Sequence, residues 1–459
     1  MELRLRSLSD SDVRLVHDKT LEILRDVGIS VKSERAFEVL KGSGAKELGG
    51  DILSISENMV ADALAAAPKS YVLGARNPEH DYPLPSPVPH YGVDGVAPSI
   101  LDIDTGEERP STKQDVYNIG RVFNRLNLGA VAWTGCSALD VSPETHSLHE
   151  FAAMISGTSK HVQFELRQAA EAKYAIEILK AILGSDDEVR KRKIASVLFC
   201  PISPLILDDS MLDAYIYLAE WDVPVNVYPC PIIGMTSPPS VFSIICQINA
   251  EVLSTLVLFE LLKPGLPIMY GSCSGSADKR TGDYFYGDES SLVSCGSIEM
   301  AHYYGLPNYV AGGGFEDFPN LMHWPDLLDG FGTLNNGLIF DMELMVIQNE
   351  TANRAYRQIR GIDTGDAADF ISELKEVGPG GAFIGRKATR RVYREGSELY
   401  SSKLFPDTLR TTYGETAEMR KIANAYIQEI LSEPNEDALP DDIRKKIDAI
   451  CDEADAELA

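Results

Sequence analysis

Short apolar runs recur along this chain at intervals of 30 to 43 residues, and an amphipathic helical stretch follows each one. The runs begin at Tyr91, Ala130, His161, Ile194, Pro224, Pro267 and Asn308. Nearly continuous hydrophobic strands that alternate with helices indicate a parallel sheet covered on both faces. Seven such units, with room for an eighth, favour a closed (β/α)₈ barrel, the TIM barrel, over an open sheet.

The alternative, a doubly wound sheet, usually carries a nucleotide-binding fingerprint. The sequence has no G-x-G-x-x-G that opens a helix and no Walker A motif. We therefore predict an α/β protein with three parts: an N-terminal helical extension over residues 1–80, a TIM barrel over 81–360 and a C-terminal extension over 361–459.

The flanking segments carry local signals of their own. Helical spacing of apolar residues begins near Asp10 or Ser11, and Gly28 suits a left-handed position past the helix end. The proline-rich stretch NPEHDYPLPSPVPH is predicted to be a surface connection. The Gly-rich EVGPGGAFIGRKATRRV is expected to fold back across the barrel mouth, and the acidic segment after Glu433 to form a solvated terminal helix.

The charge balance narrows the possible partners. Lys and Arg number 42 against 69 Asp and Glu, a net charge of −27. Such a surface repels phosphate backbones and anionic lipid, which excludes nucleic-acid and membrane partners. The first residues show no signal-peptide pattern, so we expect a cytoplasmic protein.

Cysteine and histidine patterns argue against a metal site. The seven cysteines form no C-x-x-C pair, which is typical of reduced thiols. His146 and His149 share one helix face, but no H-E-x-x-H motif accompanies them. We therefore predict no metal.

In a barrel the functional groups lie at the carboxyl ends of the strands and in the loops that follow. This rule selects aromatic and carboxylate side chains above all. Aromatic faces attract cations, so the set predicts a site for a quaternary ammonium group, although each aromatic could instead belong to the core. The substrate-binding candidates are Asp94, Trp133, Gln163, Tyr228, Tyr270, Arg280, Gly313, Phe315 and Glu316.

Individual roles follow from residue chemistry. Glu165 and Glu289 are the catalytic candidates, because a carboxylate can hold a cation or move a proton. Arg280 is the candidate clamp for a substrate carboxylate. Gly313 would let the backbone approach a ligand closely. Cys273, in Gly-Ser-Cys-Ser-Gly, is read as a small residue at a tight strand end rather than as a nucleophile.

Several longer strings occur in a recognisable order. They include VHDKTLEILRDVGISV, ENMVADALAAAPKSYVLGARNP, DTGEERPSTKQDV, KHVQFE, ADKRTGDYFYGDES, IEMAHYYGLPNYVAGGG, LIFDMEL and VGPGGAF. In this respect the chain resembles the trimethylamine methyltransferase family, including its members that lack pyrrolysine and act on quaternary amines such as glycine betaine.

The resemblance implies a TIM barrel that moves a methyl group from an amine to the Co(I) of a separate corrinoid protein, with no tightly bound cofactor of its own. It also implies a homo-oligomer. Gly312 to Phe315 stand where pyrrolysine would be, which fits a quaternary substrate. Ala382 and Ala388 stand where relatives carry His, and the region after Gly314 is short, so the eighth barrel unit is expected to be abbreviated or rearranged.

Two other functions compete with this one. A barrel methyltransferase could instead use another donor, such as a methylated thiol or an O-methyl compound. Activation of a thiol would require a zinc site that the sequence does not reveal. A non-catalytic betaine-binding or scaffold protein would bind the ligand without methyl transfer.

Overall fold

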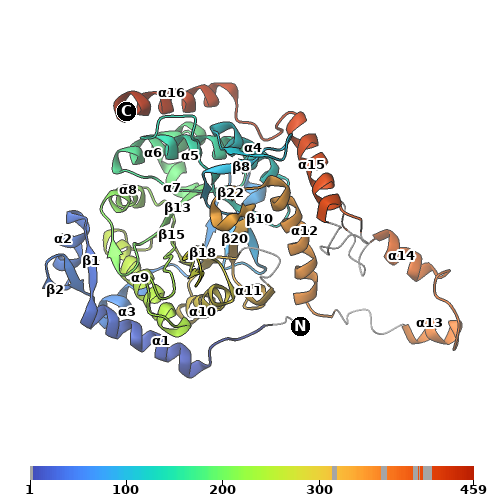
Figure 1. Ribbon diagram of the computed structural model, residues 1–459, viewed down its shortest axis with the longest axis horizontal. Coiled ribbons are helices and arrows are strands. Elements are labelled where there is room, and N and C mark those ends of the chain that lie inside the picture. Colours follow the sequence, from blue (N-terminus) through green and yellow to red (C-terminus); the bar gives the residue numbers. More distant parts are fainter. Residues whose placement is uncertain are drawn as a thin grey trace.

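Eight parallel strands close into a barrel at the centre of the molecule (Figure 1). The computed structural model describes residues 4–312, 318–362, 370–395, 402, 404–406 and 416–458. Around the barrel the strands follow chain order, and the last pairs with the first. They are β6 (His90–Val93), β10 (Gly129–Ala132), β12 (His161–Phe164), β13 (Ala195–Phe199), β15 (Val225–Val227), β16 (Ile268–Ser272), β19 (Asn308–Val310) and β20 (Leu327–Phe331).

The seven predicted runs are the first seven of these strands, each beginning within one residue of the predicted start. The (β/α)₈ class is confirmed. The outer layer consists of α4 (Lys113–Asn124), α5 (His146–Gly157), α6 (Ala172–Leu183), α7 (Asp186–Arg192), α8 (Ser210–Ala219), α9 (Val241–Leu262), α10 (Asp288–Tyr304), α11 (Phe318–Met322) and α12 (Met342–Ile359).

The eighth unit differs from the expectation of an abbreviated or rearranged end. Strand β20 is five residues long, the same length as β13, and it pairs with both β19 and β6. Helix α12 then runs for 18 residues. Burial of the apolar β20 residues Leu327, Leu328 and Phe331, as in the other barrel strands, stabilises this strand between β19 and β6. The charged Asp329 and the following Gly330 interrupt its apolar run, so the sequence pattern alone does not predict this strand.

Helix α9 is long and apolar enough to cross a membrane by length and composition alone. However, 83% of its apolar window is buried within the structure. It packs against α1 (Asp10–Glu22), α3 (Glu57–Ala66) and α10. Its apolar surface is therefore covered by the N-terminal segment and the barrel's outer ring.

The N-terminal segment combines helices with a small sheet. Ser9 caps α1 in a capping box, so the helix begins one residue after its cap at Asp10. Gly28 has φ +77°, and its Cβ would meet the carbonyl oxygen of Leu53, so glycine is required there. The other helices of this segment are a π-helix (Ile23–Val27) and α2 (Glu34–Gly42). Its strands β1 (Ile29–Val31), β2 (Lys46–Gly49) and β3 (Ile52–Ser54) form one sheet with β14 (Ile206–Leu207).

The proline-rich connection is not only a surface link. Strands β4 (Tyr71–Leu73) and β5 (Tyr82–Leu84) pair as an antiparallel hairpin. Buried Leu73, Tyr82 and Leu84 form one cluster with barrel residues that include Val131 and Leu327. The hairpin closes the end of the barrel where the strands begin, because the same cluster includes Ala130 near the start of β10, and Leu327 is the first residue of β20.

Short strands surround the opposite end of the barrel. They are β7 (Val96–Ala97), β8 (Ser99–Leu101), β9 (Glu108–Pro110), β11 (Gly135–Cys136), β17 (Ser276–Ala277), β18 (Tyr284–Phe285), β21 (Thr333–Leu334) and β22 (Ile339–Phe340). Strands β17 and β18 form a hairpin, and β21, β22, β8 and β9 form a four-stranded sheet. All of them follow carboxyl ends of barrel strands, so they build the barrel mouth.

The C-terminal helices divide into two pairs. Helices α15 (Thr416–Ser432) and α16 (Asp441–Leu458) lie on the barrel's outer helices, and the buried Ile447, Cys451 and Ala454 fix α16 there instead of leaving it solvated. Helices α13 (Phe370–Val377) and α14 (Lys387–Glu395) extend away from the barrel (Figure 1). The Gly-rich segment between them therefore does not cover the barrel mouth.

Candidate active site

The carboxyl ends of the barrel strands open into a cavity of about 960 Å³. Side chains from all sides of the mouth contribute to it, and none of them is Lys, Arg or His among the residues described. They include Asp94, Trp133, Glu165, Cys200, Tyr228, Cys230, Cys273, Tyr284, Tyr286, Asp288, Ser291, Leu292, Asp329, Thr333, Asn335 and Asn336. A concave site at this end of a barrel is where substrates bind.

Two aspartates face each other across the closing strands. Asp94 follows β6, and the hydroxyl of Thr333 donates a hydrogen bond to its Oδ2. Asp329 lies in the middle of β20 and accepts hydrogen bonds from the Tyr228 hydroxyl and, at 3.2 Å, from the amide of Gly312. Burial, reinforced by the negative charge of Asp94, raises the pKa of Asp329 well above its ordinary value. Burial also raises the pKa of Asp94.

A third carboxyl group completes the acidic floor. Glu165 follows β12 and lines the same cavity. Burial raises its pKa to about 7, and the positive charge of Arg167 opposes this rise. Burial thus opposes the ionisation of all three carboxyl groups, and a bound cation would favour their ionised forms.

Aromatic side chains make up the walls. Trp133 follows β10 and is 7% exposed, and its buried Nε1–H has no hydrogen-bond partner among the residues that the structure describes. The Tyr228 ring lies 6.2 Å from the ring of buried Tyr309. Tyr284, in the β17–β18 hairpin, and Tyr286 cover the cavity from the loop side. Aromatic faces beside carboxylates are the surroundings that bind alkylammonium groups.

Three thiols line the cavity, those of Cys200, Cys230 and Cys273, and two of them are poor nucleophiles. A hydrogen bond with Cys230 and burial together raise the pKa of the Cys273 thiol well above its ordinary value. Burial likewise raises the pKa of Cys200. Because the thiolate is the reactive form, Cys273 acts as a small packing residue at a strand end.

The other residues singled out in the sequence lie elsewhere. Gln163 is buried within the barrel below the cavity, where it accepts a 3.3 Å hydrogen bond from Asn226. Tyr270 points outward and donates to Asn249 of α9 at 3.0 Å. Arg280 and Glu289 are exposed and do not line the cavity. Gly313, Phe315 and Glu316 lie outside the described residues.

Asp329 is the main residue that sequence reasoning missed. It belongs to the eighth strand, which the apolar pattern did not reveal. The string Leu-Leu-Asp-Gly-Phe at 327–331 contains the signal, an apolar pair followed by a carboxylate within a short run. Asp94, Trp133, Glu165 and Tyr228, in contrast, are brought together in one cavity as the strand-end rule requires.

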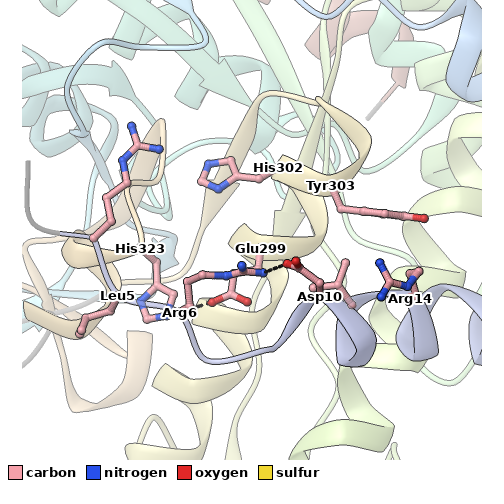
Figure 2. Close-up of a pocket in the computed structure, with 10 residues that line it drawn as sticks. Leu5, Arg6, Asp10, Arg14, Glu299, His302, Tyr303 and His323 are labelled. Atoms are coloured by element: carbon pink, nitrogen blue, oxygen red, sulfur yellow. Dashed lines mark ion pairs between the residues drawn. The ribbon is translucent and has the colours of Figure 1, made fainter.

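A second cavity, of about 470 Å³, lies on the outside of the barrel (Figure 2). Two of its charged side chains, Arg6 and Glu299, hold the N-terminal segment in place. Arg6 pairs with Asp10 at 2.7 Å, and Glu299 of α10 accepts hydrogen bonds from the amides of Ser7 and Leu8. This cavity is lined by outer helices rather than strand ends, so the mouth cavity is the candidate active site.

Within the described ranges, no three His, Cys, Asp or Glu side chains are arranged to hold a metal ion. The helix histidine His149 bonds to Lys113 and to Asp455 of α16. His161 bonds to the carbonyl of Gly74 and to Ser196. Both histidines therefore serve the packing between elements.

Fold and cavity together define a (β/α)₈ barrel protein with an acidic, aromatic-lined cavity at the barrel mouth. Comparison with known families makes this specific. Residues 3–317 and 327–459 match the family model described as trimethylamine methyltransferase (MTTB), and the chain belongs to that family.

Individual relatives match along nearly their whole length. A trimethylamine methyltransferase, MttB, of Desulfitobacterium hafniense is 28% identical, with 99% of this chain and 95% of the relative covered. A glycine betaine methyltransferase from another strain of that species is 27% identical, with 96% and 95% covered. The solved structure of MtmB in its hydroxylamine complex has a TM-score of 0.50 at 12% identity, covering 98% of this chain and 88% of that one, and it supports the fold alone.

Proposed function

We propose that this protein transfers a methyl group from a quaternary or related methylated amine to the Co(I) of a separate corrinoid protein. One observation carries the proposal: three carboxyl groups and a wall of aromatic rings converge in a cavity at the barrel mouth. Membership of a family whose members are named for methyl transfer from trimethylamine and glycine betaine supports it.

The reaction requires a balanced displacement. The bond between nitrogen and methyl carbon breaks, its electron pair stays on nitrogen, and the methyl carbon forms a bond to cobalt. A quaternary donor already carries the positive charge that this electron pair neutralises, so no proton is needed. The partner's Co(I) would supply the nucleophile.

The side chains of this chain would then act by binding and positioning. The faces of Trp133 and Tyr228 would contact the methyl groups of the cation, and the ionised forms of Glu165 and Asp329 would balance its charge. Exclusion of water by the aromatic wall would strengthen these attractions. The volume of about 960 Å³ exceeds what one alkylammonium head requires, which leaves room for an acceptor group to approach.

We further propose that residues 81–360 carry the reaction as one barrel domain. Residues 1–80 and 361–459 would then be extensions that support its outer layer. Expression of residues 81–360 alone would test the supporting role of the extensions. Without residues 1–80 the apolar face of α9 is exposed, so we expect this segment to be insoluble.

The direct test is an anaerobic assay with the purified full-length chain, a methylated amine and either free cob(I)alamin or a corrinoid protein. The expected result is loss of Co(I) absorbance with formation of a methyl–Co(III) product, only when the amine is present. A Trp133→Ala variant should be slowed, and exposed Leu338→Ala, outside the cavity lining, should not. Tight binding of an amine without any transfer would contradict the proposal and favour a non-catalytic binding protein.

A further inference from the structure

We infer that the methyl donor of this protein is a quaternary ammonium compound without a carboxylate, with an uncharged or cationic tail instead. This inference rests on the proposed function and concerns the same cavity. Its basis is a one-sided distribution of charge. Four carboxyl side chains line the cavity, Asp94, Glu165, Asp288 and Asp329, and no described lining residue is cationic.

The neighbouring chain does not change this balance. Arg167 is the cation whose charge acts on the lining carboxyl of Glu165, and it is not among the described residues that line the cavity. The one arginine expected to clamp a substrate carboxylate, Arg280, lies exposed in the β17–β18 turn, where its amide donates to Asp278 at 2.7 Å. It does not line the cavity.

A betaine would meet an electrostatic penalty in such a site. In glycine betaine a single methylene separates the nitrogen from the carboxylate, so both charges must enter the same cavity. A buried carboxylate without a cationic partner is strongly disfavoured, and neighbouring negative groups add repulsion. A hydroxyl or ammonium tail has no such conflict, since the Asn335 and Asn336 amides and Asp288 offer acceptors at the rim.

The acidic floor also provides an independent signature. Asp329 faces Asp94, the Tyr228 hydroxyl, Cys273 and the Gly312 amide, and no cationic group is among them. Asp94 in turn faces Thr333 and the backbone of Gly95. Because these carboxyl groups have raised pKa values in the free protein, binding of a permanent cation should release protons and tighten as pH rises.

The test compares four ligands of similar size by titration calorimetry with the full chain at pH 7 and pH 8.5. They are choline, (2-aminoethyl)trimethylammonium, glycine betaine and the uncharged choline isostere 3,3-dimethylbutanol. We expect at least one of the two carboxylate-free cations to bind 10-fold or more tighter than glycine betaine, with affinity increasing at the higher pH. Glycine betaine binding as tightly as both cations would overturn the inference and leave the proposed function standing. Equal binding of the neutral isostere, or no binding by any of the four, would overturn both.

A charge-introducing variant sharpens this test without disturbing the floor. Leu292 lies on α10, lines the cavity and is 49% exposed, so Leu292→Lys should fold normally. It is expected to raise the affinity for glycine betaine relative to choline at least fivefold. The matched control is Leu338→Lys, at a residue that is 54% exposed and not part of the lining. An unchanged affinity ratio in Leu292→Lys, or an equal change in the control, would contradict the inference that the native cavity lacks a cation to pair with a substrate carboxylate.

Discussion

Replacing Glu165 by Gln should stabilise the protein at alkaline pH and leave it nearly unchanged in acid. Burial at the end of β12 raises the pKa of this carboxyl from 4.5 to about 7. Between these two values the folded protein retains a proton that the unfolded chain has lost. The stability therefore falls as pH rises through this window, and above pH 7 the full penalty of a buried carboxylate is present.

The magnitude follows from the size of the pKa shift. One pKa unit corresponds to about 1.4 kcal/mol, so the shift from 4.5 to about 7 corresponds to about 3 kcal/mol at pH 8.5. At pH 5 the same linkage gives less than about 1 kcal/mol, because only the unfolded state has begun to lose its proton. Glu165→Gln, which cannot ionise, should remove this pH-dependent penalty of about 2.5 kcal/mol between the two conditions.

Urea denaturation at pH 5 and pH 8.5 would measure the effect as the difference between the variant and the native chain. A pH-independent cost of the amide cancels in this comparison. Exposed Glu107→Gln is the control and should show no pH-dependent gain. If Glu165→Gln gives the same stability change at both pH values, the carboxyl is not held protonated by burial and the electrostatic picture of the cavity floor is wrong.

Three further predictions concern the barrel interior and the cavity. Trp133→Ala should weaken the binding of an alkylammonium ligand roughly 10-fold in calorimetric titrations, whereas Trp133→Phe should retain most of the affinity because an aromatic face remains. Gly92→Ala should lower the free energy of unfolding by about 1–3 kcal/mol in urea, because the new Cβ would lie 1.7 Å from the Tyr309 hydroxyl. Adding Tyr309→Phe should recover part of this loss, and no recovery would mean that the clash lies elsewhere. Cys273 should react slowly with iodoacetamide at pH 8 in the native protein and rapidly in urea, as followed by mass spectrometry; fast native labelling would contradict its raised pKa.

The periodicity of apolar runs was sufficient to predict seven barrel strands, because each is a nearly continuous hydrophobic stretch buried on both faces. The eighth was missed for a physical reason. Strand β20 pairs with β19 and β6 through its backbone, and this pairing tolerates Asp329 and Gly330 within the run. Its pairing partners in β19 and β6 lie 18 and more than 200 residues away in the chain, so the local sequence does not show that this strand is buried.

The strand-end rule also explains which site residues were predictable. Asp94, Trp133, Glu165 and Tyr228 follow strands whose ends the apolar runs predict, and all four line one cavity. Tyr270 follows the same rule but points toward Asn249, since alternate residues of a strand face opposite sides and the run alone does not say which. Arg280 lies in a loop whose path over the mouth depends on the β17–β18 hairpin.

By itself, the sequence determined the fold class, the parallel order of the strands and the kind of side chain gathered at their ends. These three features depend on local patterns of apolar and polar residues, because the apolar residues of each strand and helix must be buried. The tertiary structure alone decided that Asp329 joins Asp94, that Arg280 stays outside the cavity and that the proline-rich hairpin closes the barrel's far end. Such pairings join residues far apart in the chain, and their energies depend on distance and shared burial that no local pattern encodes.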